Sequence, residues 1–212
     1  MMLKRLLYIY MIFFIPIYLY YYVKNTPETK ETETGVIDIV QEPSQTPPNN
    51  IIPISVKIDD KKYQIIPLAN YEIAAKIITK NTLFDSLEKK LGPIDLGLIW
   101  GKLANENYGN YLHFRSSQRW LSWDIKRKLP YDSDYLQSHI SHNHIIPADK
   151  NIFNALERTP IGKTVRLRGY LVSVFVDGRN IWSSSLSRND TGNHACEVFY
   201  VNNVRIDQKI YK

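Results

Sequence analysis

An uncharged apolar run, LLYIYMIFFIPIYLYYYV, occupies residues 6–23 of this chain, and Lys4, Arg5 and Lys24 bracket it. Its eighteen residues would extend about 27 Å as an α-helix, roughly the thickness of a bilayer core. We therefore expect one N-terminal transmembrane signal anchor over residues 1–24, with the lipid bilayer as the partner of residues 6–23.

The end of this run favours a retained anchor over a cleaved signal peptide. A secretory signal ends in small residues that a peptidase recognises, whereas this run ends in YYYV at residues 20–23. Tyrosine is typical of the membrane–water interface. A signal peptide with a poor cleavage site is the alternative. Two basic residues on a very short N-terminal tail favour a cytoplasmic N-terminus. We expect a single-pass protein of the cell (inner) membrane with an extracytoplasmic C-terminal domain.

Two segments follow the apolar run. Residues 25–50 are rich in Thr, Glu and Pro and contain one short apolar patch, at residues 36–40. Such a segment cannot bury enough apolar surface to offset the entropy of ordering, which predicts a disordered stalk. Residues 51–212 are long enough for one domain with a hydrophobic core.

The net charge of the chain is +6, and its basic residues are scattered, with the densest run at residues 126–128. A nucleic-acid site is normally more clustered, so we expect no nucleic-acid partner. A modest basic excess fits anionic head groups or cell-wall polymers, and an ordinary solvated surface is the alternative.

Alternating apolar residues and turn signals predict a β-rich domain. Asp177-Gly178 between two apolar runs indicates a hairpin, and Gly169 indicates a bulge or bend. The expected strands are residues 55–58, 63–66, 119–125, 163–176, 179–186 and 196–206. The expected helices are residues 71–79, residues 84–91 and a segment that Asp149 caps. The sum is an α+β domain with a small twisted or barrel-like sheet and two or three short helices.

Short motifs follow one another between residues 63 and 201: Tyr71-Glu72-Ile73, Pro93-Ile94-Asp95-Leu96, Trp100-Gly101, Arg119-Trp120, His144-Ile145-Ile146-Pro147-Ala148, Gly169-Tyr170-Leu171-Val172, Ser184-Ser185-Leu186, Arg188, Asp190-Thr191-Gly192 and Ala195-Cys196-Glu197. In this order they resemble an uncharacterised family of bacterial membrane-anchored proteins with no established activity. The chain departs from that pattern at His194 and at Lys102-Leu103. The resemblance implies an anchored envelope protein and no mechanism.

Three histidines, His139, His142 and His144, lie within six residues. In an extended strand His142 and His144 face one side, where they could share a metal ion, and His139 faces the other. One hydrogen-bonded histidine and two surface histidines are the alternative. We therefore assign no metal and no other cofactor.

Cys196 is the single cysteine. Thiol acyl transfer needs a thiolate, a nearby imidazole and often an arginine, and the candidate catalytic residues are His144, Cys196, Asp190 and Arg188. The order His, Cys and then Arg205, behind an anchor and a stalk, resembles the sortases. In sortases, however, the cysteine follows a threonine at the end of an apolar strand. A small buried thiol is the alternative.

The sequence contains no phosphate loop, dinucleotide fingerprint or thioredoxin pair. Its four tryptophans could stack on sugars, and a place in the core is the alternative. We expect a non-enzymatic binding or interaction module at the cell envelope, with an envelope protein or a cell-wall component as its partner. The alternative is a Cys/His-dependent, sortase-like or metal-dependent hydrolase or transferase that acts on envelope material.

Overall fold

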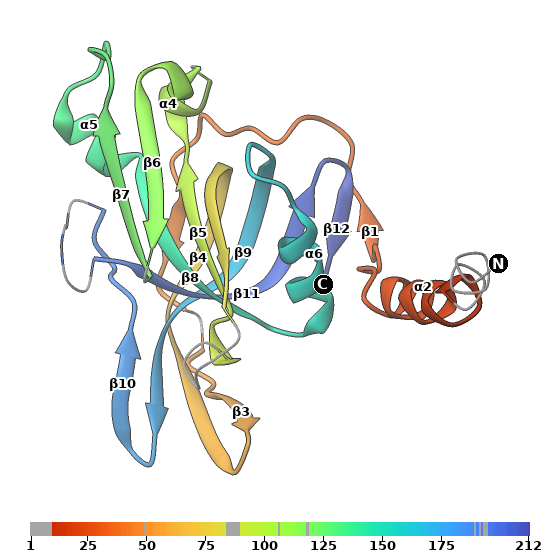
Figure 1. Ribbon diagram of the computed structural model, residues 1–212. Coiled ribbons are helices and arrows are strands. Elements are labelled where there is room, and N and C mark those ends of the chain that lie inside the picture. Colours follow the sequence, from red (N-terminus) through yellow and green to blue (C-terminus); the bar gives the residue numbers. More distant parts are fainter. Residues whose placement is uncertain are drawn as a thin grey trace.

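A 22-residue strand, β4 (Lys61–Thr82), runs through the sheet that forms most of this protein (Figure 1). The computed structural model describes residues 10–48, 50–83, 90–105, 107–117, 119–188, 190, 192 and 195–212. Within them, strands β3 (Ile54–Ile58), β5 (Ile94–Ile99) and β9 (Thr164–Val176) all pair with β4 in antiparallel register.

The described residues form one ten-stranded mixed sheet and a separate hairpin of β6 (Leu112–Ser117) and β7 (Trp120–Ile125). The order of the main sheet is β1-β12-β11-β8-β5-β4-β9-β10, and β2 also pairs with β4. The bounds of the remaining strands are β1 (Glu31–Thr32), β2 (Ser44–Thr46), β8 (Ile140–Pro147), β10 (Arg179–Ser183), β11 (Glu197–Ile206) and β12 (Lys209–Tyr211).

Strands β4, β5, β8, β11 and β9 form a closed ring, because β11 also pairs with β9. Only the β8–β11 pairing in this ring is parallel. The ring encloses the main hydrophobic core, which includes Ile73, Leu96, Ile145, Leu167 and Phe199. This strand order, with a helix between the third and fourth strands of the ring, is that of an OB-fold barrel.

Four α-helices lie entirely within the described residues: α2 (Ile15–Lys24), α4 (Gly101–Asn105), α5 (Ser133–Ser138) and α6 (Lys150–Arg158). The π-helix η1 (Tyr10–Phe14) precedes α2, and the 3₁₀ turn η2 (Tyr108–Asn110) follows α4. As predicted, Asp149 caps a helix, α6, by accepting a hydrogen bond from the Ile152 amide at 2.9 Å. The apolar face of α6 packs against the core of the ring.

Several predicted strands are confirmed. The first expected hairpin is β3–β4, the second is β9–β10, and β7 and β11 occupy the other two expected positions. The helix predicted over residues 71–79 is wrong, because these residues belong to β4. Tyr71, Ile73, Ala75 and Ile77 are buried and alternate with less buried neighbours, and β9 pairs with this stretch up to Lys76. Long-range pairing here overrides a local pattern that also fits a helix.

Some predictions fall partly or wholly on residues outside the described ranges. Of the helix expected over residues 84–91, only Lys90 and Leu91 are described, and both are helical. Residue His194 also lies outside the described ranges.

The expected N-terminal transmembrane helix is wrong for the residues described. None of their helices combines the length and the apolar character needed to cross a membrane. Residues 10–23 of the apolar run are divided between η1 and the ten-residue α2, in which Pro16 occupies the first turn. The predicted membrane location and lipid partner stay predictions.

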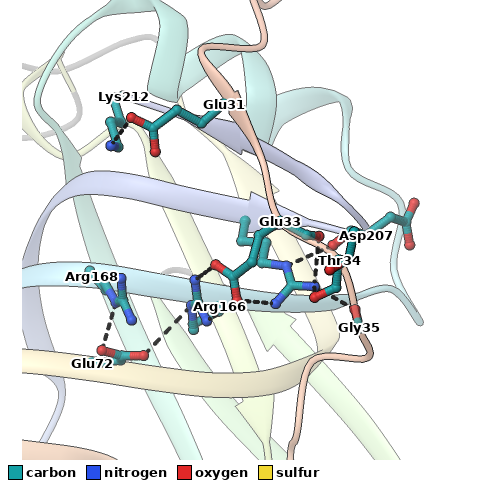
Figure 2. Close-up of polar contacts among 10 residues, drawn as sticks. Glu31, Glu33, Thr34, Gly35, Glu72, Arg166, Arg168, Asp207 and Lys212 are labelled. Carbon is teal, nitrogen blue, oxygen red and sulfur yellow. Dashed lines mark hydrogen bonds and ion pairs between the residues drawn. The ribbon is translucent and has the colours of Figure 1, made fainter.

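The expected disordered stalk is also wrong, because this segment is ordered along the sheet. Strand β1 pairs with β12, and β2 pairs with β4. The Glu33 carboxylate accepts hydrogen bonds from Arg166 (Figure 2). It also accepts one from Arg205, whose side chain is buried. A buried guanidinium needs such partners, and composition alone does not reveal this pairing.

Burial of Ile37 gives a test of the ordered segment. This side chain packs in a core cluster, whereas its neighbour Val36 is 94% exposed. We expect Ile37→Ala to lower the free energy of unfolding by about 2 kcal/mol, because it leaves a cavity. The control Val36→Ala should change it by less than about 0.5 kcal/mol. Urea denaturation measures both values, and an equal, negligible effect of the two substitutions would restore the disordered stalk.

Candidate functional site

Strand β8 carries two histidines on one face. His142 and His144 are two residues apart, and their ring centroids lie 4.8 Å from each other, as the period of a strand predicts. Cys196 immediately precedes β11, in which Glu197 pairs with Asn143 of β8. This register places the Cys196 sulfur 3.4 Å from Nδ1 of His142. One ligand atom from each of the three residues lies within 4.8 Å of the other two.

A buried carboxylate orients the second histidine. Asp95 on β5 lies directly opposite His144 in the sheet, and its Oδ1 is 2.7 Å from Nδ1 of His144. The same oxygen accepts a hydrogen bond from Arg119 at 3.0 Å. Asp95 is fully buried, so the two contacts offset the cost of its charge. Because Nδ1 of His144 is engaged, its Nε2 is the nitrogen that remains for a ligand.

His142 and Cys196 open into a cavity of about 170 Å³. The other residues of its lining are Trp100, Trp120, Leu121, Trp123, Gln137, Ile140, Ser141, Ser187, Arg188, Asp190, Gly192, Ala195 and Glu197. Arg188 forms an ion pair with Glu197 at 2.8 Å, and its guanidinium lies 4.7 Å from the ring centre of Tyr71. The candidate ligand atoms therefore border an aromatic and charged cavity.

Burial sets the protonation of the contacting pair. Burial first, and then the neighbouring His144, lower the pKa of His142 to about 4. Burial also raises the pKa of the Cys196 thiol to about 12, together with the carboxylates of Glu197 and Asp95. At pH 7 the pair is therefore a neutral imidazole beside a neutral thiol, because both charged forms are disfavoured.

The Glu197 carboxyl titrates close to neutrality. Its side chain is 4% exposed, and burial raises its pKa to about 7, although Arg188 acts in the opposite direction. One of its oxygens, Oε2, is buried without a hydrogen-bond partner among the described residues. Glu197 thus brings a polar atom with unused bonding capacity to the cavity.

The structure brings together part of the predicted catalytic set. Asp190, Arg188 and Cys196 line one cavity, and His144 lies in the same cluster as Cys196. The imidazole in contact with the thiol is that of His142, however, whereas the prediction paired Cys196 with His144.

Two other residues of the sequence analysis have partners elsewhere. His139 contacts Glu42 at 2.9 Å and stacks on Tyr135. Arg205 binds Glu33 and the backbone carbonyls of residues 33–35. Neither side chain lines the cavity that contains Cys196.

Sequence reasoning missed Asp95, Arg119 and Glu197 as parts of this site. A signal for Asp95 exists, since it is the only charged residue in the apolar stretch IDLGLI of β5. A carboxylate inside a fully buried strand requires a partner, and that requirement points to a site. No comparable local signal distinguishes Arg119.

Comparisons with known proteins add no assignment. No protein-family model, no curated protein and no solved structure matches this chain.

The titration of His142 predicts a pH-dependent stability. Its pKa is about 4 in the folded chain and 6.5 when unfolded, so the unfolded chain binds more protons between these values. Stability should therefore fall as the pH drops from 6.5 to 4, by up to about 3 kcal/mol from this residue. In chelator-treated protein, we expect His142→Gln to abolish this loss of stability between pH 6.5 and 4. The free energy of unfolding from urea denaturation at each pH measures it. Parallel pH profiles for the two proteins would contradict it.

Proposed function

We propose that this chain binds a divalent transition metal of the zinc class through His142, His144 and Cys196, for metal-assisted hydrolysis. The supporting observation is the convergence of the three ligand atoms within 4.8 Å. That the substrate is envelope material stays a prediction from the sequence.

The spacing of the donors suits a tetrahedral ion. Nitrogen and sulfur ligands bound at 2.0–2.3 Å in tetrahedral geometry lie roughly 3.5 Å apart. The separation of the Cys196 sulfur and Nδ1 of His142 is 3.4 Å, which fits this value. The widest separation between ligand atoms in the cluster is 4.8 Å. A side-chain shift of roughly 1 Å would bring it near the distance between two ligands of one tetrahedral ion.

The protonation and bonding of the ligands also suit a metal ion. A metal binds the neutral imidazole, which is the form of His142 at pH 7. The Asp95 carboxylate beside Nδ1 of His144 matches the carboxylate–histidine arrangement that supports metal ligands.

The donor set selects the metal and suggests its role. One thiolate with two imidazoles suits zinc and related borderline metals. Three protein ligands leave a fourth position, as in catalytic rather than structural zinc sites. Because Cys196 and His142 line the cavity, an ion that they held would lie beside the space for a substrate. Such an ion would supply a water nucleophile for hydrolysis.

Thiol catalysis by Cys196 and His142 is the second candidate, and the 3.4 Å contact favours it. A thiol nucleophile reacts as the thiolate, with the imidazole holding its proton. The pKa of about 12 for Cys196 and of about 4 for His142 oppose that ion pair. A bound cation would instead stabilise the thiolate, so the same electrostatics favour the metal site.

Metal titration tests the proposal directly. We expect the chelator-treated chain to bind one equivalent of Zn²⁺, and Co²⁺ to give a thiolate-to-metal charge-transfer band. Cys196→Ser and His142→Ala should each weaken binding by roughly 100-fold or more and remove the band or shift it. His113→Ala, which changes an exposed histidine on β6, is the matched control. Failure to bind, or an equal loss in the control, would refute the site.

Alkylation kinetics separate the two candidates. Since the thiol pKa is about 12 against an ordinary value of 9.0, the thiolate fraction at pH 7 should be roughly 1,000-fold lower than in an ordinary cysteine. We expect iodoacetamide to label the folded metal-free chain far more slowly than the urea-unfolded chain. Cys196 is the only cysteine, so the unfolded chain is an internal reference. Faster labelling of the folded chain would establish the thiol mechanism instead.

A further inference from the structure

Aromatic side chains form one wall of the cavity. Trp120 and Trp123 from β7 line it, and Trp100 after β5, which is 1% exposed and belongs to the core, lies behind them. Trp120 is 50% exposed, so its ring is accessible to a ligand. A flat indole ring in a concave site suits the apolar C–H face of a ring-shaped ligand.

Two residues of the lining, Arg188 and Glu197, each carry a buried polar atom with unused bonding capacity. Nη2 of Arg188 and Oε2 of Glu197 are both buried without a hydrogen-bond partner among the described residues. The two side chains are already joined by their ion pair at 2.8 Å. A hydroxyl group donates one hydrogen bond and accepts others, so one hydroxyl can satisfy both atoms at once.

The charges of the lining disfavour an anionic ligand. Among the described lining residues, Arg188 is the only cationic side chain, and Glu197 already neutralises it. Asp190 adds a second carboxylate, which accepts a hydrogen bond from Ser185. A carboxylate or phosphate ligand would therefore meet two acidic groups and, within the described part of the lining, no unpaired cation.

The volume of the cavity limits the ligand to about one ring. A cavity of about 150 Å³ holds a benzene molecule, and the volume here is about 170 Å³. We infer that the cavity binds one sugar ring of a neutral glycan, with its apolar face against Trp120 and Trp123 and a hydroxyl between Arg188 and Glu197. A neutral glycan would then be the substrate of the hydrolysis proposed above. This assignment as a substrate rests on the proposed function. Binding itself does not require the metal.

Calorimetric titration of the full chain with three neutral trisaccharides, triacetylchitotriose, cellotriose and maltotriose, tests this inference. Benzoate and trialanine serve as an anionic ring and a neutral peptide of similar size. We expect saturable binding of at least one trisaccharide in both chelator-treated and Zn²⁺-loaded protein, and at least tenfold weaker binding of both comparators to the chelator-treated protein. Binding of none of the trisaccharides, or tighter binding of benzoate or trialanine, would overturn the inference.

Variants locate the binding in this cavity. Trp120→Ala should weaken trisaccharide binding at least tenfold, and Glu197→Gln should weaken it while the chain still binds one equivalent of Zn²⁺. Ile125→Ala is the matched control, because Ile125 is also exposed on β7 but does not line the cavity. An equal loss in the control would show nonspecific stacking and overturn the inference. Zinc binding without trisaccharide binding refutes this inference alone, and trisaccharide binding without zinc binding refutes the proposed function alone.

Discussion

The ring of strands closes because β9 meets β11 without a side chain at Gly169. A Cβ atom at this position would lie 1.9 Å from the backbone oxygen of Tyr200, which no side chain can tolerate. Close approach here lets β11 pair with β9 on one side and with β8 on the other. The parallel register of β11 and β8 in turn places Cys196 beside His142. The candidate site therefore depends on one glycine far from it in the sequence.

Asp95 connects the buried strand β5 to two residues of the candidate site, Arg119 and His144. A buried carboxylate is costly unless cations or donors surround it, and here Arg119 and His144 provide those contacts. Arg119 in turn lies 4.7 Å from the ring centre of Trp182, whose ring also lies beside His144. These contacts hold the His144 ring in one orientation, with Nδ1 engaged. The ring orientation that the proposed metal site requires is thus present without a bound ion.

Sequence reasoning succeeded where local chemistry decides the structure. Asp177 and Gly178 both adopt positive φ, as a tight hairpin turn demands, and Asp149 caps its helix with its own side chain. It failed where distant residues decide. Residues 71–79 are a strand because β9 lies beside them, and the segment around Glu33 is ordered because buried Arg205 binds it. Cys196 contacts His142 rather than His144 because of the parallel register between β11 and β8. No local sequence pattern predicts this register.

Burial that weakens Cys196 as a nucleophile makes it suitable as a ligand. A thiol with a pKa of about 12 stays protonated until a cation replaces its proton, which a divalent metal does directly. The surrounding charges are already balanced, since Asp95 pairs with Arg119 and Glu197 with Arg188. A divalent ion with one thiolate would add a single positive charge, close to the exposed carboxylate of Asp190. The loaded site would then be nearly neutral overall, and such a site favours an uncharged substrate whose polar groups are hydroxyls.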